Sequence, residues 1–124
     1  MFALYQHDLT GRPLDELFEA DARPFTRALA HAVEDNCDEL DDQIARHAIG
    51  WRPERIAPLE RSILRVGLLE LLHPELVADR GPIPPEGAID EAVEIAKTFC
   101  GSEAPGFVNG ILDAAYRERA APAP

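Results

Sequence analysis

The fold of this chain is decided by LERSILRVGLLELL (residues 59–72), followed by IDEAVEIAKTF (residues 89–99) and GFVNGILD (residues 106–113). In each stretch the apolar residues recur at the three- and four-residue spacing of an amphipathic helix. The first stretch carries an apolar stripe so wide that it must contact more than one neighbour. Gly67 and Gly110 would permit close approach of helix backbones. No stretch of the chain alternates with a period of two, so the sequence predicts an all-α fold with six to seven helices.

The other predicted helices are marked by turn and cap residues. A helix ends near Asp8 and a turn covers residues 9–13. A short helix follows, and a longer one begins at a cap formed by Asp21, with Pro24 in its first turn. Residues 36–38 bend or break this longer helix, which stops at Gly50. Two further expectations are a core position for Trp51 and a cap at Ser102 for the last helix.

The length and charge of the chain limit the kind of protein that it forms. Its 124 residues fit a single domain, expected over residues 1–119 with a disordered tail over 120–124. The net charge of −11 argues against non-specific binding to a phosphate backbone and favours a basic protein partner. Local binding of single-stranded RNA stays possible, because salt screens distant acids beyond about 10 Å. No secretory signal or membrane-spanning run is present, so the expected compartment is the cytoplasm.

No pattern in the sequence predicts catalysis, a metal site or a cofactor. Cys37 and Cys100 lack the spacing of a metal or redox pair and are expected to be half-buried or buried free thiols. The four histidines are scattered, and no recognised catalytic motif occurs. The many pairs of acids are what chance gives in a chain with 23 Asp and Glu residues. The sequence therefore predicts a binding protein rather than an enzyme.

The three helical stretches and their order resemble the NusB family of bacterial transcription antitermination factors. The matching segments are Glu60-Arg-Ser-Ile-Leu-Arg65, Asp90-Glu-Ala-Val-Glu-Ile-Ala-Lys97-Thr-Phe99 and Phe107-Val-Asn-Gly-Ile-Leu-Asp113. Trp51 and the following Arg55-Ile56 pair match the family pattern before the first of them, and Ala3-Leu-Tyr5-Gln6 matches its opening ALYQ helix. The resemblance covers nearly the whole chain and is diffuse only over residues 14–50.

This resemblance implies two small packed helical bundles and a function without chemistry. Members of the family bind the boxA element of ribosomal RNA leaders together with NusE, which is also a small-subunit ribosomal protein. The pair acts in the antitermination complex of RNA polymerase and prevents premature termination in ribosomal RNA operons. The resemblance therefore implies boxA RNA, NusE and RNA polymerase as partners.

The chain departs from the family at three positions that bear on RNA binding. Family members usually carry an arginine-rich stretch before the ALYQ helix, whereas Met1 lies two residues before Ala3 here. We expect this arm to be encoded upstream, with its true absence as the alternative. Gly106 replaces a common lysine, and Asp90 replaces an asparagine. Both replacements weaken the expected attraction for phosphate.

Four residues are predicted to contribute to RNA binding. Phe107 could stack on a base, worth about 1–3 kcal/mol, or could serve only the core. Tyr5 could meet a base or phosphate with its ring and hydroxyl, or could simply pack within its helix. Glu103 would repel phosphate and lower RNA affinity. Asn109 is the fourth candidate, although Asn109 and Gly110 fit tight helix packing better than chemistry.

Glu60 and Arg61 are predicted to bind the protein partner. An acid at Glu60 is also favoured by the dipole of its own helix, without any partner. Arg61 and Arg65 lie four residues apart on one face, so they could serve an interface or bridge to Glu60 or Glu70. Arg65 in particular fits a structural ion pair.

The acidic edge of the next helix supplies two more predicted partner contacts, Asp90 and Glu94. The alternative for this edge, which also includes Glu91, is a solvated face. Lys97 could pair locally with Glu94, three residues before it.

Two other functions stay open at this stage. One is an acidic helical adaptor that binds protein only, indicated by the net charge of −11. The other is the NusB-like domain that precedes some RNA cytosine methyltransferases. A homodimer is also possible, because the apolar stripe over residues 64–72 is wide enough to pair with a second copy.

Overall fold

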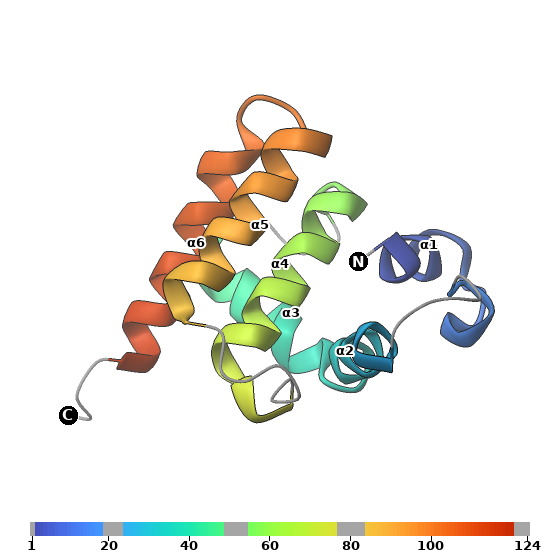
Figure 1. Ribbon diagram of the computed structural model, residues 1–124. Coiled ribbons are helices and arrows are strands. Elements are labelled where there is room, and N and C mark those ends of the chain that lie inside the picture. The colour runs from blue at the N-terminus through green and yellow to red at the C-terminus, as the bar shows by residue number, and fades with distance from the viewer. Residues whose placement is uncertain (1, 19–23, 49–54, 77–83, 121–124) are drawn as a thin grey trace.

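The computed structural model describes residues 2–18, 24–48, 55–76 and 84–120. Within them the chain forms six α-helices, with short 3-10 turns at residues 14–16 and 74–76, in agreement with the predicted all-α fold. Figure 1 shows them in the order α1 (Phe2–Thr10), η1 (Leu14–Glu16), α2 (Pro24–Asp35), α3 (Cys37–His47), α4 (Pro58–Leu72), α5 (Pro85–Phe99) and α6 (Ala104–Ala120).

Helix α4 is the centre of the fold, because it contacts each of the other five α-helices. Helices α5 and α6 form one group against α4, and α1 and α2 form another, while α3 runs behind α4 and also contacts α6 (Figure 1). Its wide apolar stripe is therefore shared among several neighbours, as the sequence indicated. Three of its leucines have no solvent exposure: Leu64, Leu68 and Leu69.

The ends of α4 follow from local chemistry. Pro58 occupies the first turn, where its missing N–H costs nothing, after Ala57 in an extended conformation. At the other end, Arg119 of α6 donates hydrogen bonds to the carbonyl oxygens of Leu71, at 3.1 Å, and of Leu72. These carbonyls have no partner within their own helix, so α6 satisfies them and fixes its own position against α4.

The other helix boundaries test the remaining expectations. The predicted interruption near residue 36 is confirmed, because Asn36 separates α2 from α3 and donates its side-chain amide to the carbonyl of Ala32 at 2.7 Å. Helix α1 continues to Thr10 and ends at Gly11, whose φ of 71° needs a residue without a Cβ. The prediction that Ser102 caps the last helix is wrong, because α6 begins at Ala104 after a turn.

Two glycines behave differently in the structure. A Cβ on Gly67 would lie 2.9 Å from a methyl group of Leu112, so Gly67 does let α6 approach α4 closely. Gly110 is exposed, and a Cβ there would meet nothing within 4 Å. The prediction that Gly110 serves helix packing is therefore wrong.

Asp21 and Trp51 lie outside the described residues, and so do residues 121–124 of the predicted tail. Helix α6 includes Ala120, one residue beyond the predicted domain boundary. None of the described helices is long and apolar enough to cross a bilayer.

Candidate RNA and partner site at the start of α4 and α6

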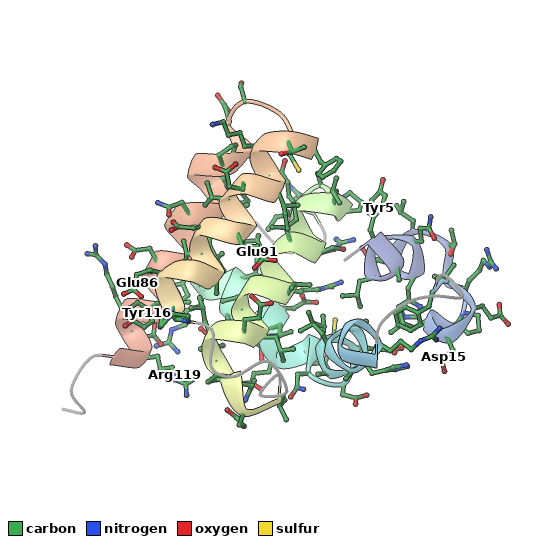
Figure 2. The ribbon with its side chains drawn as sticks, viewed as in Figure 1. Tyr5, Asp15, Glu86, Glu91, Tyr116 and Arg119 are labelled. Carbon is green, nitrogen blue, oxygen red and sulfur yellow. The ribbon has the colours of Figure 1, made fainter. Side chains whose placement is uncertain are left out.

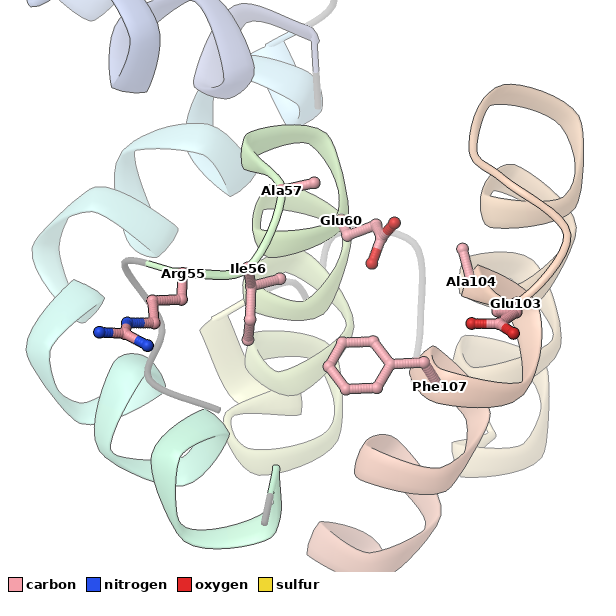
Figure 3. Close-up of a pocket in the computed structure, with 7 residues that line it drawn as sticks. All are labelled: Arg55, Ile56, Ala57, Glu60, Glu103, Ala104 and Phe107. Carbon is pink, nitrogen blue, oxygen red and sulfur yellow. The ribbon is translucent and has the colours of Figure 1, made fainter. Parts of the chain in front are cut away.

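A pocket of about 410 Å³ opens where α4 and α6 begin side by side. The segment that leads into α4 forms one wall, and the first turn of α6 forms the other (Figure 3). The lining residues are Arg55, Ile56, Ala57, Glu60, Glu103, Ala104 and Phe107. Figure 3 shows the Phe107 ring extending from α6 toward Ile56. An aromatic ring at the edge of an open pocket can stack on a planar ligand.

The pocket combines apolar and charged walls. Ile56 and Ala104 line it and are buried, with 4% and 3% of their surface exposed. Glu60 stands in the first turn of α4 and Glu103 directly precedes α6, so each carboxylate lies at a helix N-terminus that stabilises negative charge. Among the described residues that line the pocket, Arg55 is the one cation, and it is exposed.

Besides burial, the charge of Glu60 affects the pKa of the nearby thiol of Cys100. The pKa of Cys100 is raised by burial and, in addition, by the negative charge of Glu60. Glu60 therefore acts on the end of α5 as well as on the pocket. Cys37 and Cys100 are free and half-buried, as expected.

The structure brings together two of the predicted RNA contacts, Phe107 and Glu103, in this pocket. It adds Glu60, which the sequence assigned to the protein partner. Phe107 is half-buried, so it packs against the core and also presents its ring to the pocket. In this position Phe107 can both pack in the core and stack on a base.

Tyr5 and Asn109 do not line the pocket. Asn109 is exposed on α6 two residues after Phe107, which turns it toward a different face. Tyr5 is half-buried on α1, beside the end of α4 where the pocket lies (Figure 2). An ion pair between Asp8 and Arg61 connects α1 to that part of α4.

The structure gives Arg61 a position inside the molecule. Its side chain is 13% exposed, and its Nε donates to Oδ2 of Asp8 at 3.2 Å. The expected bridge to Glu60 or Glu70 is therefore wrong, because Arg61 pairs with α1. A partner contact by Arg61 stays a prediction that this geometry does not favour.

Arg65 forms the structural ion pair that the sequence suggested. Its Nε and Nη2 each donate to a carboxylate oxygen of Asp41 at 2.8 Å, in the two-pronged geometry that suits a guanidinium. Its Nη1 also lies 3.5 Å from Asp8. Through this network α4 holds both α1 and α3, which fixes the position of Tyr5.

The acidic edge of α5 is exposed. Asp90 and Glu94 face solvent, as either prediction for them requires. The proposed local pair between Glu94 and Lys97 is wrong, since the structure has no ion pair between these two residues.

Two residues carry features that the sequence did not reveal. Phe99 was assigned to the apolar face of its helix, but 55% of its surface is exposed at the end of α5. The sequence could have indicated this exposure, because Phe99 is the last residue of the helix, where neighbouring helices cover less of the surface. Glu70 is 8% exposed although it is charged, and only its place within the leucine-rich stripe hinted at this burial. Among the described residues no cluster of His, Cys, Asp and Glu could hold a metal ion.

This chain has relatives among known proteins. The NusB family profile matches residues 1–117. The chain is 38% identical to the transcription antitermination protein NusB of Rubrobacter xylanophilus, over 90% of this chain and 80% of that protein. It is 40% identical to the protein of the same name from Myxococcus xanthus, over 90% of this chain and 84% of that one.

Solved structures show the same relation. A NusB structure from T. maritima matches with a TM-score of 0.81 and 31% identity, covering 94% of this chain and 84% of that chain. A structure of the antitermination factors NusB and NusE in complex with double-stranded RNA matches with a TM-score of 0.77 and 26% identity, covering 94% of this chain and 89% of that one. The sequence, the helical arrangement and these relatives lead to one conclusion: this chain belongs to the NusB family.

Proposed function

We propose that this protein is a cytoplasmic transcription antitermination factor that binds boxA-type leader RNA together with NusE and carries out no chemistry. The observation that carries the proposal is the likeness to a NusB solved with NusE and RNA, which extends over 94% of this chain. Residues 1–119 would act as one domain in this role. The antitermination relatives match over 80% and 84% of their own length, which supports this function over that of a methyltransferase domain.

The pocket between α4 and α6 is the proposed RNA site. Phe107 offers an aromatic face, and stacking needs no particular base. The starts of two helices point their partial positive charge at the same place, which suits a phosphate. Glu60 and Glu103 oppose this attraction, so affinity for RNA alone should be modest and should depend on the partner.

The proposed protein surface adjoins the RNA site. Glu60 lies in the pocket itself, while Asp90 and Glu94 lie exposed along α5. A basic partner that covers these acids would remove the charge that repels RNA. Binding of NusE and of RNA should therefore be cooperative.

Replacement of Phe107 by leucine should weaken boxA RNA binding by roughly 5- to 100-fold, the loss of one base–aromatic stack. Leucine keeps the apolar packing, so the fold should persist. The measurement is fluorescence anisotropy with labelled RNA in the presence of NusE. Phe18→Leu is the matched control, because Phe18 is also a half-buried aromatic residue but packs with His31 and Arg27 in the other helix group. Equal affinities for the Phe107 variant and the wild type would remove Phe107 from the RNA site.

Replacement of Glu103 by glutamine should raise RNA affinity by about two- to fivefold at low salt, because one repelling charge is lost. The gain should shrink as the salt concentration rises. Glu86→Gln provides the control. Glu86 also stands in the first turn of a helix, but it lies at the start of α5, whereas Glu103 follows the end of α5 (Figure 2). A weaker complex after Glu103→Gln would mean that this carboxylate accepts a hydrogen bond from the RNA.

A further inference from the structure

Glu70 is a buried carboxyl group without a partner. It lies on α4 facing α5, and 8% of its surface is exposed. Within the described part of the chain it forms no hydrogen bond or ion pair, whereas Arg61 and Arg65 on the same helix are each paired with an acid. A buried carboxyl group that is not hydrogen-bonded destabilises the fold. A cation that paired with this carboxylate would offset that cost.

A small cavity lies directly beside Glu70. Its volume is about 30 Å³, and Glu91 of α5 lines it together with Glu70. The other described lining residues carry no polar side chain: Ile63, Val66, Gly67, Ala88, Ala92 and Ile95. One water molecule needs roughly 10–15 Å³ of such space. The cavity therefore has room for a group of the size of water or an ammonium ion, but not for a planar guanidinium group.

We propose that this cavity is a socket for the ammonium group of a lysine from a basic protein partner, with Glu70 and Glu91 as its two acceptors. The inference rests on the proposed function, and it names the chemistry by which that partner is held. A lysine can bury its aliphatic stem against Val66 and Ile95 while its charged end reaches the carboxylates.

The surroundings of the socket favour a cation. Glu91 lies over the seam between α4 and α5 in Figure 2. Asp90 and Glu94 are two further exposed acids on α5. The whole chain carries a net charge of −11. A second copy of the chain would bring more negative charge to the same face, so we commit to a basic partner.

The titration of Glu70 gives this socket a measurable signature. Burial, and then the charge of Glu91, raise the pKa of Glu70 from 4.5 to about 7. Among the charged groups on the neighbouring helices, Arg119 of α6 is bonded to the carbonyls of α4 and Glu39 of α3 lies 3.0 Å from His73, while Asp90, Glu94 and Lys97 of α5 are exposed. An ammonium group binds the ionised form of Glu70 better. Affinity for the partner should therefore rise as the pH rises through about 7.

The experiment compares the binding of NusE to the full chain at pH 6 and pH 8, at constant ionic strength, by calorimetry. The wild type should bind about tenfold more tightly at pH 8, the change in the ionised fraction of a group with this pKa. Glu70→Gln should bind at pH 8 about as weakly as the wild type does at pH 6, and the difference between the two pH values should largely vanish. Glutamine keeps the volume of a protonated glutamate, so the fold should be retained.

Two controls distinguish binding of a lysine at Glu70 from a general attraction between an acidic chain and a basic partner. Glu94→Gln removes an exposed acid from the same surface and should keep the tenfold pH dependence. NusE with acetylated lysines should lose it, because the charge of the ammonium group is gone. Binding of wild type and Glu70→Gln with the same pH dependence would overturn the socket and leave the proposed function intact. Absence of NusE binding at every pH would overturn both.

Discussion

Replacement of Leu112 by alanine should lower the free energy of unfolding by about 2–5 kcal/mol, the cost of a cavity in a closely packed core. Leu112 has no solvent exposure and packs on Gly67 at the contact between α6 and α4. The measurement is urea unfolding followed by helical circular dichroism. Arg117→Ala is the control on the same helix, since the Arg117 side chain is 78% exposed, and it should change stability by less than about 0.5 kcal/mol. A loss below about 1 kcal/mol for Leu112→Ala would contradict the packing described for α6.

A second substitution tests the contact itself. In the wild type, a Cβ at Gly67 would lie 2.9 and 3.2 Å from the two methyl groups of Leu112. Gly67→Ala should therefore gain less than the usual helix preference of about 1 kcal/mol for alanine over glycine. In the Leu112→Ala background the same change fills vacated space and should recover part of the lost stability. Simple additivity of the two changes would show that the residues do not touch.

Replacement of Arg65 by leucine should cost about 2–4 kcal/mol, because it leaves Asp41 charged and half-buried without its partner. The Arg65 side chain is 13% exposed and that of Asp41 is 29% exposed. The double variant Arg65→Leu/Asp41→Leu should be more stable than Arg65→Leu alone, because no unpaired charge remains. Arg12→Leu is the control, since Arg12 lies 3.9 Å from Glu16 on the surface, and it should change stability by less than about 0.5 kcal/mol.

The ion pairs of Arg61 and Arg65 with Asp8 and Asp41 should also limit the mobility of α1. Arg65 and Arg61 hold Asp8 of α1, the helix that carries Tyr5. Loss of Arg65 should therefore loosen α1 and increase hydrogen exchange in Phe2–Thr10 more than in α5 or α6. Uniform exchange across the molecule would show that the network stabilises the fold as a whole and does not position α1 specifically.

The sequence was most informative where local chemistry decides the structure. The bounds of α4 follow from Pro58 and from the regular spacing of its apolar residues, and the interruption at Asn36 follows from a residue that prefers caps and turns. Local patterns were insufficient where the outcome depends on a distant segment. Asp8 and Arg61 are 53 positions apart, so spacing within one helix suggested the wrong partner for Arg61.

The sequence identified individual residues of the candidate site but did not predict that they lie together in one pocket. Phe107, Glu103 and Glu60 were each selected from the sequence, and their meeting in one pocket depends on how α6 lies against α4. The burial of Glu70 depends on the same packing with α5. Helical periodicity identifies the face on which a residue lies, but not how deeply a neighbouring helix covers it.

The central claim is that this fold presents one surface on which RNA and a basic protein partner assist each other. The most direct test is the affinity for boxA RNA of the full chain alone, of NusE alone and of the two together, at physiological salt. We predict that the two together bind more tightly than either alone, and that Phe107→Leu removes most of this gain. An affinity of the pair no higher than that of NusE alone would contradict the claim.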